Sequence, residues 1–377
     1  MIDFDIAKRS KQLLLKMKGI LFSMSMQVFC FSLMNPVLFA EEILDKSELM
    51  YYQDENGNVK KVEDPAGWEK RRASVLDGIQ KAMGRIPDMD TFPPLDPIVE
   101  ETVREDSYTR QKLTLQVEEG DRLSCFLMVP DNLEGKVPAV LALHPTHPMG
   151  KSDTVGLSGR ENRNYGQELA RLGFVVLVPD YPSFGEEVDY DFGSDNYLSG
   201  SMKGIVNHMR CVDYLVSLPY VDPDNIGVIG HSLGGHNAMF AAVFDQRFKA
   251  VVSSCGWTPF HDYYQGKIKG WTSQRYMPLL EDKYHLDPDL VPFDFYGIIA
   301  ALAPRPFLSV SPLRDSNFDV SGVRKGVAEA RLVYELLGAG DNLLVEHPDS
   351  EHDFIPEMRQ EAYSFLAKYL CFNLREH

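Results

Sequence analysis

Cysteine is scarce in this chain, with five among 377 residues. No two of them form a Cys-x-x-Cys pair, and Cys125, Cys211, Cys255 and Cys371 are widely separated in dissimilar surroundings. A chain of this length can bury a large core and does not need a disulfide framework. We therefore expect no such framework, and the sequence leaves open whether a single bridge forms.

Positive charge is also in short supply. The chain has 38 Lys and Arg against 55 Asp and Glu, which gives a formal net charge of −17 at pH 7. Proteins that bind nucleic acid rely on clustered Lys and Arg to displace counterions from phosphates. The charge balance therefore argues against nucleic acid as a partner.

Several motifs for cofactors and metals are missing. The chain contains no G-x-x-x-x-G-K-[ST] and no G-x-G-x-x-G, so no nucleotide cofactor is implied. It has no H-E-x-x-H either. His144 and His147 form an H-x-x-H, but without further ligands this is weak evidence for a metal, and a structural loop pair is the alternative. We expect neither a cofactor nor a metal.

The first 40 residues differ from the rest of the chain. A start with five Lys and Arg precedes an uncharged run from Gly19 to Ala40, and Glu41 follows at once. This pattern is typical of a secretory signal peptide over residues 1–40, with cleavage after Ala40. We therefore expect the mature chain to be exported, to the periplasm or outside the cell.

An uncleaved membrane anchor is the alternative for this segment, because the uncharged run is about long enough to span a bilayer. Polar or helix-breaking interruptions at Ser23, Gln27, Asn35 and Pro36 argue against an anchor. Cys30 lacks the preceding small residues that a lipid-attachment site needs. We expect no stable membrane association after cleavage.

Residues 41–105 are expected to form an N-terminal helical extension and a linker. The Asn56-Gly57 pair indicates a turn near the start of this stretch. The stretch "WEKRRASVLDGIQKAMGRI" that follows has apolar residues at helical spacing. Prolines in "PDMDTFPPLDP" then end the pattern.

The pattern of predicted secondary structure changes for residues 106–377. "RQKLTLQV" and "RLSCFLMV" are separated by "EEGD", which predicts a hairpin. Strand patterns then alternate with helix patterns to the end of the chain, and the later strands, such as "VPAVLALH" and "FVVLVPD", are continuous apolar runs. Such runs are typical of parallel strands buried on both faces. The sequence thus predicts an α/β fold with a mostly parallel central sheet flanked by helices.

One motif stands at the end of a predicted strand. "NIGVIG" leads into "HSLGG", which places Ser232 in a G-x-S-x-G motif between a strand and a helix. A tight strand-to-helix turn needs glycines because Cβ atoms would clash, and it lifts the serine hydroxyl clear of the sheet. The helix start also favours negative charge developing nearby. An inert Gly/Ser turn is the alternative, but the strand and helix context favours Ser232 as a nucleophile.

A serine nucleophile needs a base and an orienting acid, which follow it in the order Asp or Glu, then His. Asp315 comes just after the predicted strand "RPFLSVS" and is our candidate acid, with Asp319 as the alternative. His352 lies in the loop after the last predicted strand and is our candidate base. His347 is the alternative base, although a solvated strand-end side chain also explains it.

The oxyanion of an acyl-transfer intermediate needs two backbone N–H donors. Leu233, directly after the nucleophile, is expected to supply one of them. The other is expected from the loop "LHPTHPMGK" after an earlier strand, where Pro145 has no N–H. We assign Thr146 to this role, with His147 as the alternative.

These features together resemble the α/β-hydrolase superfamily, and within it the dienelactone-hydrolase-like and acetyl-xylan-esterase-like branches. The resemblance runs from about Tyr108 to the C-terminus and is carried by "GHSLGG", "LAPRPFLSVSPLRDSNFD", "SEHDF" and "VPDYPSFGE". Dienelactone hydrolases themselves carry a cysteine nucleophile, so the serine at 232 favours carboxylic esters. The resemblance places Ser232, Asp315 and His352 at the triad positions.

Residues 257–292 are too long for a plain connection, and we expect them to form a cap insertion over the site. The segment is rich in aromatic residues, including Trp257 and Trp271. We assign these two to substrate binding, where aromatic rings can stack on a sugar or an aromatic acyl group. The alternative is that most of these rings simply pack the cap onto the sheet.

The expected function is that of an exported serine esterase, with a small-molecule or carbohydrate ester as substrate. The branch resemblance and the export signal suggest acetyl esters on a polysaccharide. One alternative is a serine exopeptidase of the prolyl-oligopeptidase type. Such enzymes usually carry a large propeller before the hydrolase domain, and the roughly 65 residues of 41–105 are too few for one. A second alternative is a hydrolase fold kept as a non-catalytic binding protein, against which the intact Ser, Asp and His argue.

Overall fold

The computed structural model describes residues 45–375. The signal peptide predicted over residues 1–40 lies outside the described residues, as does its cleavage site. Within the described range, no helix combines the length and the apolar character that crossing a membrane would require. The four cysteines of this range are all free.

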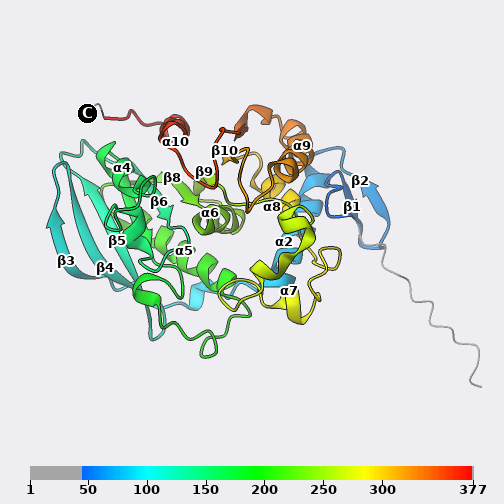
Figure 1. The fold of residues 1–377 in the computed structure, drawn as a ribbon, viewed down its shortest axis with the longest axis horizontal. Coiled ribbons are helices and arrows are strands. Elements are labelled where there is room, and N and C mark those ends of the chain that lie inside the picture. Colours follow the sequence, from blue (N-terminus) through cyan, green and yellow to red (C-terminus); the bar gives the residue numbers. More distant parts are fainter. Residues whose placement is uncertain (1–44, 376–377) are drawn as a thin grey trace, which may run out of the picture. The chain divides into compact units, whose positions relative to one another are not determined.

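A nine-stranded sheet forms the centre of the described chain (Figure 1). Its strand order is β11-β10-β9-β8-β6-β7-β5-β4-β3. Strands β6 to β11 pair in parallel, whereas β3, β4 and β5 pair antiparallel at one edge. The strand bounds are β3 (Ile98–Arg104), β4 (Tyr108–Glu118), β5 (Asp121–Pro130), β6 (Val137–Leu143), β7 (Val175–Pro179), β8 (Val221–His231), β9 (Phe248–Ser254), β10 (Phe307–Val310) and β11 (Leu343–Glu346). The predicted mostly parallel α/β sheet and its β4–β5 hairpin are confirmed.

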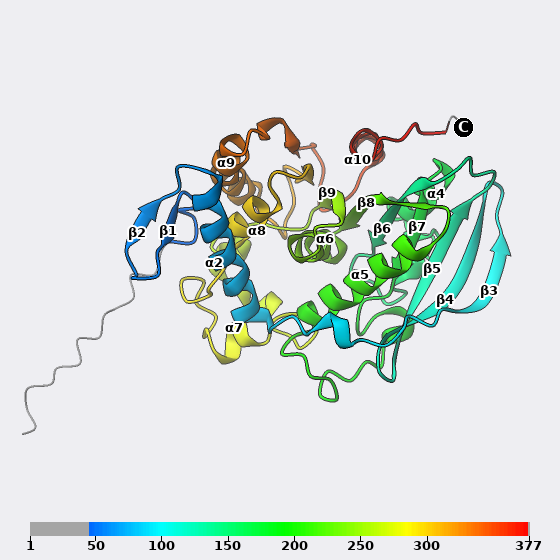
Figure 2. The same ribbon diagram turned by 180° about the vertical axis from the view of Figure 1, so that it is seen from behind.

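Helices cover both faces of this sheet (Figures 1 and 2). One face packs against α5 (Gly200–Ser217), α6 (Leu233–Phe244), α8 (Phe295–Leu302) and α9 (Val320–Leu336). The other face packs against α4 (Tyr165–Arg171) and α10 (Pro356–Tyr369). Because side chains alternate along a strand, Leu141 of β6 lies in the first core and its neighbour Val140 in the second. This two-sided burial explains the continuous apolar runs of the sequence.

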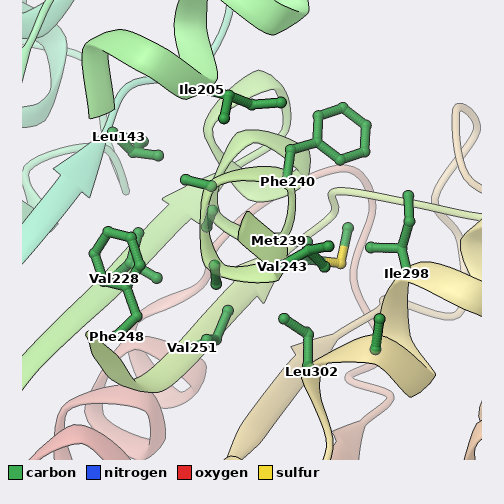
Figure 3. Close-up of a cluster of buried hydrophobic side chains, with 14 of the residues drawn as sticks. Leu143, Ile205, Val228, Met239, Phe240, Val243, Phe248, Val251, Ile298 and Leu302 are labelled. Atoms are coloured by element: carbon green, nitrogen blue, oxygen red, sulfur yellow. The ribbon is translucent and has the colours of Figure 1, made fainter. Parts of the chain in front are cut away.

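Helix α6 lies in the middle of the larger core (Figure 3). Its side chains meet the sheet at Val228 and Val251 on one side and α8 at Ile298 on the other. Phe240 is 1% exposed, and truncating such a ring to alanine typically costs about 3–5 kcal/mol. Eleven of the twelve residues of α6 are buried, so packing on nearly all sides holds the helix in place. Its first residue directly follows Ser232, and this rigidity therefore holds the start of the site.

The N-terminal region joins the same body. A small hairpin of β1 (Tyr51–Gln53) and β2 (Val59–Lys61) turns at the predicted Asn56-Gly57 site. The predicted helix is α2 (Pro65–Met83), which begins where the Asp64 carboxylate accepts the Gly67 N–H at 2.7 Å.

Helix α2 packs against α8, so close that a Cβ at Gly297 of α8 would lie 2.9 Å from the Val75 side chain of α2. Strand β3 is the edge strand of the main sheet, although its residues fall within the stretch expected to be linker. The sheet therefore begins earlier in the chain than residue 106.

Short elements make up the connections near the carboxyl ends of the parallel strands. Helix α3 (Lys151–Thr154) follows β6, and the 3₁₀ turn η2 (Gly185–Glu187) follows β7. The segment after β9 contains η3 (Tyr263–Gly266), η4 (Ile268–Trp271) and α7 (Leu279–Asp282). Two further 3₁₀ turns are η1 (Met89–Thr91) and η5 (Gly340–Asn342).

Candidate active site

The turn from β8 into α6 has a strained backbone. Ser232 has φ 55° and ψ −116°, a conformation that residues with a side chain rarely adopt. A Cβ at Gly230 would lie 2.2 Å from the Gly234 carbonyl, and a Cβ at Gly234 would lie 2.0 Å from the Leu143 carbonyl oxygen. The two glycines of the motif are therefore required by close backbone contacts, as expected for a turn that exposes its central serine.

Ser232, His352 and Asp315 form one chain of hydrogen bonds. His352 Nε2 lies 2.9 Å from Ser232 Oγ, and His352 Nδ1 lies 2.9 and 3.0 Å from the two Asp315 carboxylate oxygens. The three residues come from loops after β10 and β11 and from the β8–α6 turn, which meet at the same edge of the sheet. In this arrangement the imidazole can accept the serine proton while the carboxylate holds its tautomer.

Backbone hydrogen bonds hold the Asp315 carboxylate in place. Its side chain is 1% exposed, and one carboxylate oxygen accepts the N–H groups of Asn317 at 2.8 Å and Phe318 at 3.1 Å. The alternative acid, Asp319, instead accepts the Ser321 N–H at 2.7 Å and caps α9. The alternative base, His347, hydrogen bonds with the Ser311 carbonyl at 2.7 Å. Neither alternative reaches the chain of hydrogen bonds.

The two predicted oxyanion donors lie beside the serine. Leu233 is the first residue of α6, so its N–H has no partner within the helix. Thr146 lines the same hollow as Ser232 and Leu233. Of the loop histidines, the buried His144 accepts the Tyr181 N–H through Nε2 at 2.9 Å, and His147 accepts the Met149 N–H through Nδ1 at 3.3 Å. Both contacts are those of structural loop residues.

A buried ion pair fixes the loop that carries Thr146. Lys151, only 2% exposed, lies with its Nζ 2.5 Å from Asp180 and 2.8 Å from Glu186, both in the segment after β7. Gly150 is required here, because its Cβ would lie 2.0 Å from an Asp180 carboxylate oxygen. This contact joins the β6 loop to the "VPDYPSFGE" segment that carried part of the resemblance. The loop therefore has little freedom to move its oxyanion donor.

A small hollow lies next to Ser232, which we call the aromatic hollow. It has a volume of about 160 Å³. It is lined by Thr146, Ser232, Leu233, His236, Tyr263, Tyr264, Gly270, Trp271, Tyr276, Asn317 and Phe318. The segment after β9 supplies most of the rings, as expected of a cap insertion. No carboxylate, Lys or Arg is among the lining residues.

The two tryptophans assigned to substrate binding have different places. Trp271 lines the aromatic hollow. Trp257 is 1% exposed, donates its indole N–H to Ser309 Oγ at 2.9 Å, and is not among the residues that line the hollow. Its predicted contact with substrate therefore has no support from its position, and its ring instead packs the cap onto the core.

A second hollow, which we call the charged hollow, is lined by His352. It has a volume of about 780 Å³. All of its lining residues are polar or charged, and they are Glu161, Asn162, Arg163, Arg314, Ser316, Asp349, Ser350, Glu351, His352 and Asp353. Arg163 pairs with Asp353 at 2.5 Å, and Arg314 pairs with Asp349. Carboxylates thus outnumber arginines around it.

One group of the described residues could offer three ligands to a metal ion. Atoms of Cys255, Asp315 and His352 lie within 4.8 Å of one another. Asp315 and His352 are already hydrogen bonded to each other, and burial raises the pKa of the Cys255 thiol well above its usual value. A thiol that resists ionisation is a poor ligand, so we assign no metal to this group.

Sequence reasoning missed His236 in the aromatic hollow. His236 lies on α6, four residues after Ser232, and its backbone N–H donates to the Ser232 carbonyl at 3.2 Å. Ser232 precedes the helix with a non-helical backbone, so the spacing of four residues did not by itself predict that His236 lines the same hollow. Asn317 and Phe318 were also missed, because only the path of the loop after β10 brings them to the hollow.

Comparison with known proteins gives the family. Residues 163–376 match the profile of the prolyl oligopeptidase family, which is more than half of the chain. The chain belongs to this family. Its fold is shared with a glucuronoyl esterase from Solibacter usitatus, which superposes with a TM-score of 0.67 at 18% identity over 86% of this chain and 98% of that one. The predicted α/β-hydrolase resemblance is confirmed, and acetyl xylan esterases are among the structures that share the fold.

Two proteins that are related in sequence align with most of this chain. YtaP of Bacillus subtilis (strain 168), provisionally named a hydrolase, is 29% identical in an alignment 313 positions long that covers 79% of this chain and 100% of YtaP. The carbohydrate esterase MZ0003, from an unknown prokaryotic organism, is 24% identical in an alignment 336 positions long that covers 74% of this chain and 76% of that protein. Family, fold and relatives together make this protein a hydrolase of the α/β fold.

Proposed function

We propose that this hydrolase cleaves carboxylic esters through a Ser232-His352-Asp315 triad. The observation that carries the proposal is the unbroken chain of contacts at 2.9 Å, from Ser232 Oγ to His352 and from His352 to Asp315, at a strained strand-to-helix turn. A serine hydroxyl is a weak nucleophile, and a neighbouring oriented base is what activates it.

The proposed reaction proceeds in two halves. His352 Nε2 takes the Ser232 proton as Oγ attacks the ester carbonyl, and the resulting oxyanion is stabilised by the N–H groups of Leu233 and Thr146. When the tetrahedral intermediate collapses, His352 returns the proton to the leaving alcohol. Water then attacks the acyl-enzyme by the same route, releasing the acid and restoring the Ser232 hydroxyl.

The two hollows fit the two parts of an ester. The acyl carbon is bonded to Ser232 in the intermediate, and the hollow that contains Ser232, Leu233 and Thr146 is the small aromatic one. The leaving alcohol must receive its proton from His352, which lines the charged hollow. We therefore place a small acyl group in the aromatic hollow and the alcohol toward the charged hollow.

The polar lining of the charged hollow suits a hydroxyl-rich alcohol such as a carbohydrate, because planar carboxylate, amide and guanidinium groups pair well with hydroxyls. The carbohydrate esterase MZ0003 among the relatives supports the same substrate class. Export of the mature chain after Ala40, as the signal pattern predicts, would bring the enzyme to polysaccharides outside the cytoplasm. An acetylated polysaccharide is accordingly our proposed substrate.

The test is release of p-nitrophenol from p-nitrophenyl acetate by the protein and by its Ser232→Ala variant. We expect turnover by the protein and a loss of about 10⁴-fold or more in kcat for the variant. Labelling by a fluorophosphonate, which requires an activated serine, is expected only in the unsubstituted protein. Absence of both turnover and labelling would favour a non-catalytic binding role.

Membership of the prolyl oligopeptidase family favours a second candidate, a serine exopeptidase. The same triad can attack an amide, and the discriminating measurement uses the same preparation with proline-containing peptide p-nitroanilides. For an esterase we expect no detectable anilide release under conditions in which the acetate ester turns over. Anilide release that exceeds acetate turnover would make the peptidase the better assignment.

A further inference from the structure

Two buried polar side chains in the aromatic hollow have unused hydrogen-bonding groups. His236 is 5% exposed, and neither of its ring nitrogens meets strict hydrogen-bond geometry with another described residue, although the Gly256 backbone is close enough to one of them to interact with it. Trp271 is 4% exposed, and its indole Nε1 likewise has no partner among the described residues. Both residues line the hollow that contains Ser232. Buried polar groups in native proteins are almost always paired, so two such groups in one hollow require an explanation.

The two groups lie close together and close to the nucleophile. The rings of His236 and Trp271 meet edge to face, with centroids 4.9 Å apart at an angle of 63°. His236 lies in the first turn of α6, four residues after Ser232, and both residues line the same hollow. An acyl group whose carbonyl oxygen is held by the Leu233 N–H therefore extends toward these two side chains.

Charge limits what can bind there. Burial lowers the pKa of His236 to about 3, against a smaller opposing effect of the Gly256 carbonyl, so the ring is neutral at ordinary pH. The residues lining the aromatic hollow include no Asp, Glu, Lys or Arg. An ionised acyl substituent would lose its hydration without gaining a countercharge.

The unused groups match a hydroxyl. A neutral imidazole has one N–H donor and one acceptor nitrogen, and an indole Nε1–H is a donor only. A hydroxyl can accept the hydrogen bond of Trp271 Nε1–H and donate its own to the acceptor nitrogen of His236, while the His236 N–H faces the Gly256 carbonyl. Unbranched alkyl acyl groups offer nothing to either residue and leave both unpaired once water is displaced.

We propose that His236 and Trp271 form a recognition site for a neutral hydroxyl group carried by the acyl part of the ester. The substrate class is thus an ester of a hydroxy acid, with the hydroxyl within a few bonds of the carbonyl. The proposal rests on the proposed function, since it needs an acyl group bonded to Ser232.

The test compares matched pairs of p-nitrophenyl esters, acetate against hydroxyacetate and butyrate against 3-hydroxybutyrate. The readout is the ratio of kcat/KM within a pair, after correction for the spontaneous hydrolysis of each ester. This ratio does not depend on the fraction of active protein. We expect the protein to favour one of the hydroxylated esters by about tenfold or more. In His236→Phe and Trp271→Phe, which keep an aromatic ring and remove the nitrogen, the ratio should fall toward one.

Phe240→Leu is the matched control, because its ring contacts His236 with centroids 5.5 Å apart and carries no polar group. Disturbed packing alone would change the ratio equally in Phe240→Leu and His236→Phe, and that result would overturn the proposal. So would equal hydrolysis within both pairs by the unsubstituted protein.

Fluorophosphonate labelling of Ser232 separates this failure from failure of the esterase assignment. Labelling and acetate turnover without a hydroxyl preference overturn the hydroxy-acid site alone. Absence of both labelling and turnover overturns the esterase function and the hydroxy-acid site together. Labelling of His236→Phe also shows that this variant is folded.

Discussion

The two hollows beside the triad differ in almost every respect. The aromatic hollow has about 160 Å³, lies beside Ser232, and is closed mainly by the long segment after β9. The charged hollow has about 780 Å³, lies beside His352, and is built from short loops before α4 and after β10 and β11. Rings stiffen the first, whereas ion pairs such as Arg163–Asp353 shape the second.

Under the proposed function, this difference would let one triad serve two unlike chemical groups. In the proposed reaction the acyl group is bonded to Ser232 for half of the cycle, and a small site limits what can occupy it. The alcohol leaves and must exchange with water, so an open polar surface suits it. The following predictions each change one side of the site, or the triad between the two, from the largest expected effect to the smallest.

Removing the Asp315 carboxylate, which contacts His352 Nδ1, should impair catalysis whatever acyl group or alcohol the ester carries. In Asp315→Asn the amide cannot hold the same tautomer, and we expect kcat to fall by about 10⁴-fold on any ester. Asp319→Asn, a few residues further along the same loop, is the control, because Asp319 caps α9 instead. It should retain kcat within about threefold, since asparagine is an equally good cap. Steady-state kinetics on p-nitrophenyl acetate checks both, and equal losses would contradict the assignment.

Acid should destabilise the aromatic hollow through His236. The folded pKa of His236 is about 3, whereas the unfolded chain takes up a proton near the ordinary value of 6.5. Stability from this residue is therefore complete above pH 6.5 and declines as pH falls toward 3. Replacing it in His236→Phe should reduce the loss of unfolding free energy between pH 7 and 4 by about 3 kcal/mol. Denaturant titrations at these two pH values measure the difference, and parallel losses in both proteins would contradict it.

Opening the aromatic hollow should relax acyl selectivity. Tyr276 lines the hollow and contacts both His236 and Trp271 with its ring. In Tyr276→Ala we expect kcat/KM for p-nitrophenyl butyrate to rise about tenfold relative to the acetate ester, because two more methylenes then fit. The same series on the unsubstituted protein gives the reference. An unchanged ratio would mean that the acyl chain lies elsewhere.

A substitution in the charged hollow should weaken recognition of the alcohol and leave recognition of the acyl group unchanged. Arg314 lines this hollow and is half exposed. In Arg314→Ala we expect the ratio of kcat/KM for an acetylated oligosaccharide to that for p-nitrophenyl acetate to fall about threefold to tenfold. Arg85→Ala removes an exposed ion pair with Asp77 on the far helix α2 and is the matched control. Equal ratios in all three proteins would show that the alcohol does not bind in this hollow.

Much of the fold and of the triad could be read from local patterns. The G-x-S-x-G turn follows from glycines that backbone contacts require, and the apolar runs follow from strands buried on both faces. Asp315 and His352 could be placed because an acid and a base must follow parallel strands at the same edge of a sheet. The choice of Asp315 over Asp319 agrees with the structure, in which Asp319 is the N-cap residue of α9. Only the path of the loop decides which of the two carboxylates reaches His352.

What the sequence determined by itself was the class of chemistry: a serine between a strand and a helix, with an acid and a base after it. Tertiary structure alone decided what surrounds that serine. It buried Trp257 against Ser309, turned Trp271 and His236 into the hollow, and gathered Arg163, Arg314 and Asp353 from distant loops around the charged hollow. Local residue preferences act over a few positions, whereas these contacts join residues from 35 positions apart, for His236 and Trp271, to 190 positions apart, for Arg163 and Asp353, and only packing of the whole core can select them.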